Sequence, residues 1–334
     1  MAVNLFTPEL IMKKNRIQKA VFGLFAAALC MTAFTGCGKS RSEQQAEYTD
    51  SGLEALANGD YEHADSDFDK ALDLAGMRVG EDEIKISYYK AEAQALSGDY
   101  EGALTTCDHL ISYNEKDQNA YFLKGSIAYL SGDTDGAIMD YNSAVSVSDQ
   151  DYELCIRIYE NLNARGDTDD ALPYLNQALS FSGNSAEDCY QKGRIYLLLS
   201  EYDKAESLLN TAVDKGKDEA MIALSEVYSA EGDEEKAHDI LTKYVDKGTA
   251  TAESCEVMGD LLMNQGDYPG ALSSYRKGLK MKSPSNRQEL MKGEIGALEA
   301  GGSFDKAYTK AKSYIKEYPS DQEMIREIRF LSNL

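Results

Sequence analysis

Gly59-Asp60-Tyr61-Glu62-His63-Ala64 is the first of eight related six-residue stretches in this chain. Every copy closes on an alanine, and seven of the eight open on a glycine. Successive closing alanines are 39, 34, 34, 34, 32, 34 and 36 residues apart. A period near 34 residues is the signature of an array of helical repeats. The other seven copies span 98–103, 132–137, 166–171, 200–205, 232–237, 266–271 and 302–307.

The residue types of each copy suit a tight turn between two helices. A glycine just past the end of the first helix can adopt the left-handed conformation that closes it without strain. The aspartate after it can cap the second helix, because its carboxylate accepts backbone N–H bonds and faces the positive end of the helix dipole. The alanine lies where the two helices cross, and a larger side chain would push them apart. We therefore predict an all-α chain of helix-turn-helix units.

Further positions make the chain resemble the tetratricopeptide repeat family. A small residue precedes the alanine by twelve positions in six copies, and a large apolar or aromatic residue follows it by four positions in six. Tyr159 and Ile295 depart from the small-residue rule, Pro319 is the single example of the family's terminal proline, and the chain has no tryptophan. The small residues are Gly52, Ala91, Gly125, Gly193, Ser225 and Gly259, and the large ones are Phe68, Tyr141, Leu175, Leu209, Leu241 and Tyr275.

The resemblance covers about residues 45–321 and implies an all-α, right-handed superhelical solenoid of about eight repeats. It also implies a scaffold that binds other proteins, because this repeat is reused for many partners. Residues 322–334 fit one more amphipathic helix, which would cap the last apolar face of the array. The predicted repeats span about 45–78, 84–117, 118–151, 152–185, 186–217, 218–251, 252–285 and 288–321.

The first 36 residues resemble a bacterial lipoprotein signal peptide. Four basic residues between Lys13 and Lys19 precede an uncharged stretch, 20–34, that is too short to span a membrane comfortably. Thr35-Gly36-Cys37 resembles the end of a lipobox, in which the cysteine receives a diacylglyceryl group and becomes the mature N-terminus. The alternative is an ordinary cleaved signal with a fortuitous cysteine.

The lipoprotein interpretation predicts where the protein lies. It would be secreted and held on the extracytoplasmic face of a bacterial membrane by lipidated Cys37, with several acyl chains giving stable anchoring. Residues 37–44 would form the lipidated cysteine and a polar tether. Met12 makes a better start than Met1, because residues 1–11 carry Glu9 and no basic group.

The net charge of the chain narrows the classes of partner that it is expected to bind, and its cysteines are expected to be structural. The formal net charge is −23, or about −26 once residues 1–36 are removed. This acidity argues against nucleic acid and against anionic lipid as binding surfaces, so that the lipid anchor is the only expected contact with a membrane. It favours a basic or polar protein ligand, although acidity also keeps a secreted protein soluble. The four cysteines beyond Cys37 are expected to be free and buried: Cys107, Cys155, Cys189 and Cys255.

In the tetratricopeptide repeat family the first helix of each pair lines a concave groove, at fifteen, eleven and eight positions before the repeat alanine. Here these positions are aromatic in the second, third and fifth repeats and acidic in the fourth, sixth and seventh, the last through Glu256 and Asp260. Aromatic side chains give rigid contact area, and carboxylates favour Lys or Arg on a ligand. Packing between repeats is the alternative for each. The predicted partner groove is Tyr88, Glu92, Phe122, Ser126, Tyr129, Glu160, Asn163, Tyr190, Arg194 and Glu226.

Nothing in the sequence points to catalysis, a cofactor or a metal. The three histidines, His63, His109 and His238, fall in different repeats and no catalytic motif surrounds them. Gly38-Lys39-Ser40 imitates the end of a P-loop but lacks its earlier glycine. We therefore expect a scaffold or adaptor that is not an enzyme, acting in assembly of envelope machinery. The alternative is a binder of glycan or cell-wall polymer through the tyrosine-rich groove.

Overall fold

The computed structural model describes residues 40–334, apart from 77–78, 245–246, 248–250, 320 and 333–334. The predicted signal peptide and Cys37 lie outside these residues. Within them the chain is all-α and forms seventeen helices that follow one another in pairs. The first four pairs are α2 (Arg41–Ala57) and α3 (Tyr61–Ala75), α4 (Glu81–Ser97) and α5 (Tyr100–Tyr113), α6 (Gln118–Ser131) and α7 (Thr134–Val147), and α8 (Tyr152–Asn163) and α9 (Thr168–Ser180).

The second half of the chain continues the same pattern and adds one helix. Its pairs are α10 (Ala186–Leu198) and α11 (Tyr202–Asp214), α12 (Ala220–Ala230) and α13 (Glu234–Tyr244), α14 (Ala252–Asn264) and α15 (Tyr268–Leu279), and α16 (Arg287–Ala300) and α17 (Phe304–Glu317), followed by α18 (Gln322–Leu331). The chain divides into two compact units, Met1–Tyr174 and Leu175–Leu334, with the boundary inside α9. We call them unit 1 and unit 2 and describe each by itself.

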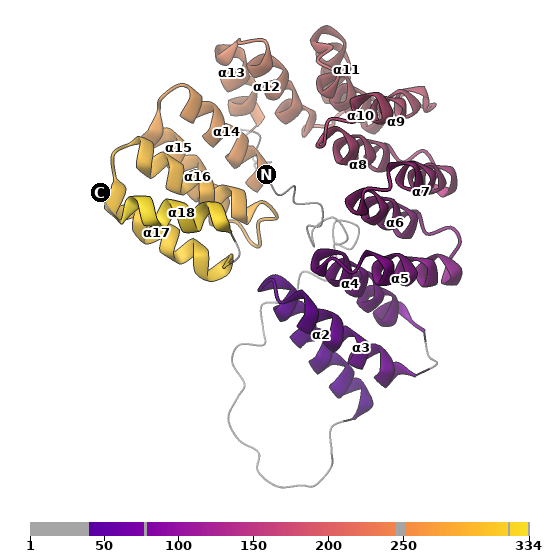
Figure 1. The fold of residues 1–334 in the computed structure, drawn as a ribbon. Helices are drawn as coiled ribbons and strands as arrows, with labels where there is room; N and C mark the ends of the chain where they lie inside the picture. The colour runs from indigo at the N-terminus through magenta and orange to yellow at the C-terminus, as the bar shows by residue number, and fades with distance from the viewer. Residues whose placement is uncertain (1–39, 77–78, 245–246, 248–250, 320, 333–334) are drawn as a thin grey trace. The chain divides into compact units, whose positions relative to one another are not determined.

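Within each unit, successive pairs stack side by side (Figure 1). The first helices of neighbouring pairs touch one another: α4 contacts α2 and α6 in unit 1, and α12 contacts α10 and α14 in unit 2. The backbones of second helices in neighbouring pairs lie farther apart, although α7 and α9 touch through the Tyr141 and Tyr174 rings, whose centroids are 6.3 Å apart. The first helices therefore form the inner layer of each stack, and the second helices form the outer layer.

The turn of each pair has the geometry that its sequence predicts. The seven glycines that open the repeated stretches all have positive φ, from 72° at Gly302 to 94° at Gly132 and Gly166. The fifth stretch opens on Ser200, which takes the same left-handed conformation at φ 57°. Because that conformation is costly for a residue with a Cβ, its appearance at Ser200 shows how strongly the surrounding pair imposes this turn. Asp99, like Asp133 and Asp267, accepts a hydrogen bond from the backbone N–H three residues on.

Small residues let the two helices of each pair approach closely. All eight repeat alanines are completely buried. A Cβ added to Gly259 would lie 2.4 Å from the Tyr275 ring, and one added to Gly193 would lie 2.6 Å from Leu209. The small residue of the first helix thus receives the large residue of the second helix, which is the physical reason that both positions recur with the period of the repeat.

A helix begins inside the predicted tether at the first end of the array, and a helix packs on the last repeat at the other end. The tether predicted for 37–44 is wrong for its last four residues, because α2 begins at Arg41. Ser40 starts it with a capping box: its hydroxyl accepts from the Glu43 N–H, and the Glu43 carboxylate accepts from the Ser40 N–H. At the other end, α18 packs Met324 and Leu331 into the cluster that contains Tyr314. This is the packing expected of a capping helix.

Cys107, Cys155, Cys189 and Cys255 are buried and free, as predicted. Burial raises the pKa of the Cys155 thiol to about 12. It is therefore an inert core residue at neutral pH. Among the described helices, none is both long and apolar enough to cross a membrane.

Candidate functional site

Five of the ten predicted groove residues are buried in unit 1. Tyr88 and Glu92 lie on α4, and Phe122, Ser126 and Tyr129 lie on α6; each is less than 9% exposed. They occupy the inner layer as expected, but the neighbouring repeats cover them. Their side chains therefore present little accessible surface.

The cover comes from the following repeat. The guanidinium of Arg157 lies 3.9 Å from the centroid of the Phe122 ring. Ser126 accepts hydrogen bonds from the Asn161 amide of that following repeat, at 3.2 Å, and from the Tyr141 hydroxyl of its own repeat, at 3.3 Å. The Tyr129 hydroxyl donates to Asp167 at 2.5 Å. These side chains join adjacent repeats, which is the packing alternative that the sequence left open.

Glu160 and Asn163 are exposed on α8. The Asn163 amide oxygen accepts a hydrogen bond from the Thr168 hydroxyl at 2.8 Å, across the turn to α9. The Glu160 carboxylate lies close enough to Arg157 to act against the lowering of the Arg157 pKa by burial. Both predicted residues are therefore accessible from solvent, and each also has a role within its own repeat.

In unit 2 the predicted residues come together on the inner layer. Tyr190 and Arg194 on α10 are half-buried, whereas Glu226 on α12 is exposed. Glu253, which is exposed, and Glu256, which is half-buried, join them from α14. We call these five residues the acidic inner face of unit 2. Of the five, only Glu253 was absent from the groove positions expected from the sequence, because it lies three residues before Glu256.

Electrostatic coupling shows that these side chains share one environment. Burial, and then the carboxylates of Glu253 and Glu226, raise the pKa of Tyr190 to about 12, while Arg194 acts to lower it. Burial by the surrounding helices and the Glu253 carboxylate raise the pKa of Glu226, and Arg194 again opposes them. Glu226 is thus open to water yet flanked by protein and by like charge, which disfavours its ionised form.

The same face has one cationic side. Arg194 lies 5.7 Å from the centroid of the Tyr190 ring, and the Lys217 ammonium lies 5.1 Å from it. Lys217 also pairs with Glu187 at 2.7 Å. At the other side, the Glu256 carboxylate accepts from the Asn286 amide at 2.5 Å, and burial is the main cause of its raised pKa. The face therefore runs from an aromatic and cationic side on α10 to an acidic side on α14.

Comparison with known families agrees with this architecture. A tetratricopeptide repeat-like domain model matches residues 199–300, and three tetratricopeptide repeat models match 49–112, 118–151 and 162–220. The chain is a tetratricopeptide repeat protein. Proteins built from this repeat serve in general as scaffolds that bind proteins or peptides and are not enzymes.

Individual relatives share parts of the chain. BBSome complex member BBS4 of Bos taurus is 28% identical over 125 residues, which are 37% of this chain and 24% of that protein. A solved tetratricopeptide repeat protein from Parabacteroides merdae ATCC 43184 is 16% identical, covers 87% of this chain and all of its own, and has a TM-score of 0.43. The APC/C hetero-tetramer Cut9-Hcn1 gives 11% identity, coverage of 84% and 54%, and a TM-score of 0.44.

The part of the chain that the structure describes contains no group of three or more His, Cys, Asp or Glu side chains arranged to hold a metal ion.

Glu92 gives a test of the buried half of the predicted groove. Burial raises its pKa to about 8, so the folded protein binds this proton more tightly than the unfolded chain does. Stability should therefore fall as pH rises from about 4.5 to 8, by at most about 1.4 kcal/mol per pH unit from this group. Glu92→Gln should remove that dependence and be more stable than the parent at pH 8. Urea unfolding between pH 5 and 9 measures it.

The exposed Glu115→Gln, which also removes one carboxylate, is the control and should keep the parent's pH dependence. An unchanged pH dependence in Glu92→Gln would show that the Glu92 carboxyl is hydrated in the folded protein.

Proposed function

We propose that this tetratricopeptide repeat protein is an extracytoplasmic scaffold, anchored to a bacterial membrane through lipidated Cys37, that holds a protein partner during assembly of envelope machinery. Membership of a protein-binding repeat family supports the scaffold role. The anchor and the envelope role rest on the sequence of residues 13–37, in which a basic segment, an apolar stretch and a cysteine follow one another.

The acidic inner face of unit 2 is the observation that carries the binding proposal. Glu226, Glu253 and Glu256 repel one another, and the surrounding helices keep part of the compensating water away. A Lys or Arg side chain placed among them would relieve the repulsion and make charge-assisted hydrogen bonds. Tyr190 beside them offers an aromatic surface for the aliphatic part of such a side chain. A basic, extended protein segment fits this combination.

Binding of glycan through a tyrosine-rich groove receives less support. Tyr88, Phe122 and Tyr129 were the aromatic residues expected to stack on sugar rings, and each is at most 8% exposed. A sugar could reach them only if the repeats of unit 1 separated. We therefore retain the protein scaffold as the proposed function.

The triple substitution Glu226→Gln, Glu253→Gln and Glu256→Gln should weaken binding of a basic partner segment at least tenfold. It removes three negative charges while preserving the size of each side chain. The measurement is crosslinking in native cells with a tag after Leu334, followed by quantitative mass spectrometry of the co-purified envelope proteins. The partner recovered with the parent protein should be depleted by the triple substitution.

A charge-matched control lies on the loop before α13 and on its exposed surface: Glu231→Gln, Glu235→Gln and Asp239→Asn. This variant should recover the partner as the parent does. If both variants lose the partner equally, overall charge controls binding and the acidic inner face is not the site. If neither variant loses it, the partner lies elsewhere on the molecule.

The anchor has its own test. Cys37→Ser should abolish incorporation of a palmitate analogue and move the protein from the membrane fraction to the soluble fraction, because the thiol is the atom that would carry the lipid. Cys30→Ser, inside the predicted signal peptide, should leave both results unchanged. Retained label in Cys37→Ser would refute the lipoprotein interpretation.

A further inference from the structure

The charge of the chain reverses near its C-terminal end. Residues 40–267 contain 48 Asp and Glu against 17 Lys and Arg, whereas residues 268–334 contain 8 against 12. The outer helices show the same change: α5, α7 and α9 carry acidic residues and no Lys or Arg, whereas α15 carries two cations and no acid. An overall net charge of −23 thus conceals a basic region over residues 268–334.

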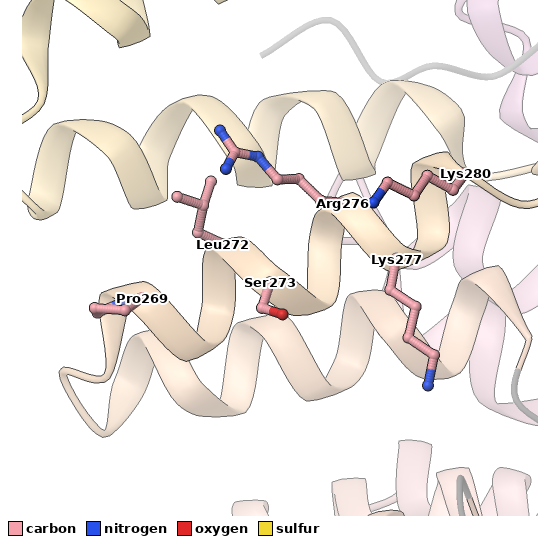
Figure 2. A pocket seen from close by; sticks show the side chains of 6 residues that line it. All are labelled: Pro269, Leu272, Ser273, Arg276, Lys277 and Lys280. Atoms are coloured by element: carbon pink, nitrogen blue, oxygen red, sulfur yellow. The ribbon is translucent and has the colours of Figure 1, made fainter.

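The basic residues gather around two adjoining depressions on α15, α16 and α17. The first has a volume of about 400 Å³ and is lined by Pro269, Leu272, Ser273, Arg276, Lys277 and Lys280. Figure 2 shows that all six side chains come from the α15 segment. The second has a volume of about 230 Å³, and its lining includes Glu294 and Lys310.

A buried carboxylate links the two depressions. The Glu294 side chain on α16 is 3% exposed, and it accepts from Arg276 of α15 at 2.8 Å and pairs with Lys310 of α17 at 3.0 Å. Both cations stay partly exposed, at 43% and 46% of their side chains. Glu294 therefore holds a guanidinium and an ammonium in place at the surface before any ligand arrives. Such fixed donors lose little entropy when they bind.

Other cations of this surface are available to a ligand. Lys277, Lys280 and Lys306 are exposed, and no ion pair joins them to a carboxylate of the described residues. Cations near the end of α15 also stabilise the negative end of its helix dipole. Lys306, however, lies in the first turn of α17, where the dipole disfavours a positive charge. Helix stability alone therefore does not explain the distribution.

We propose that this basic outer face, formed by Arg276, Lys277, Lys280, Lys306 and Lys310, binds an acidic segment of a partner protein. The recessed shape, with Leu272 and Pro269 among the lining residues, suits an extended peptide whose carboxylates pair with individual cations. The 48 acidic residues of the preceding repeats would repel a long polyanion such as nucleic acid. The surface is distinct from the acidic inner face of unit 2 and has the opposite charge preference, so the protein would bring two partners together.

The test is the double charge reversal Lys277→Glu and Lys280→Glu in the full chain. Both side chains are exposed and lack an ion pair in the described structure, so the fold should persist with only a small loss of stability from the α15 dipole, as thermal unfolding followed by circular dichroism would check. The matched control is Lys116→Glu with Lys243→Glu, two exposed lysines of the acidic repeats. The probe is a fluorescent synthetic peptide of ten alternating Asp and Glu residues, with the Asn and Gln version for comparison.

The parent and the control should bind the acidic peptide, and the double reversal should bind it about tenfold more weakly. Neither the parent nor the control should bind the Asn and Gln peptide, and 0.5 M NaCl should weaken their binding of the acidic peptide. Absence of peptide binding by the parent would overturn the proposal. A second result would also overturn it. If the parent bound vesicles containing 30% phosphatidylglycerol but no peptide, and the double reversal lost the vesicle binding, the surface would recognise lipid headgroups.

Discussion

The close crossing of two helices at an alanine is the contact on which the rest of the molecule depends. All eight alanines are fully buried, and the glycines of the facing helices leave room for the ring or branched side chain that follows four residues later. Each pair buries its apolar surface only against its neighbours, so the array is stable because the same contact recurs. The left-handed residue of each turn fixes where the second helix starts, and even Ser200 conforms to it.

This architecture separates two surfaces with different chemistry. The inner layer is formed by first helices that touch one another, so its side chains either join neighbouring repeats, as Ser126 and Tyr129 do, or face solvent, as Glu226 does. The outer layer is formed by second helices whose exposed residues have no packing duty. Substitution there changes charge without disturbing the crossing, which explains how α15 can carry two cations and no acid while α5, α7 and α9 carry acids and no Lys or Arg.

The fold follows from the sequence because its rules are local and repeat eight times. The site follows less well because exposure is decided by the next repeat. The repeat rule places Phe122 at an inner position whether it is exposed or covered. The Arg157 guanidinium that covers it lies 35 positions later in the chain, at a residue that no repeat rule specifies. In unit 2 the same rule places Tyr190, Arg194 and Glu226 on one face. The sequence analysis did not predict the basic outer face for two reasons. The groove rule concerns first helices only, and the net charge is a sum over the whole chain.

Substitution of two glycines tests the close crossing most directly. In Gly125→Ala the new Cβ would lie 2.8 Å from the Tyr141 ring and 3.1 Å from the Ala137 carbonyl oxygen, so urea unfolding should show a loss of about 1–3 kcal/mol. In Gly296→Ala the new Cβ meets nothing within 4 Å, and the higher helix propensity of alanine should stabilise the protein by up to about 1 kcal/mol. Equal gains in stability at both positions would contradict the account, because the helices would then not cross closely at Gly125.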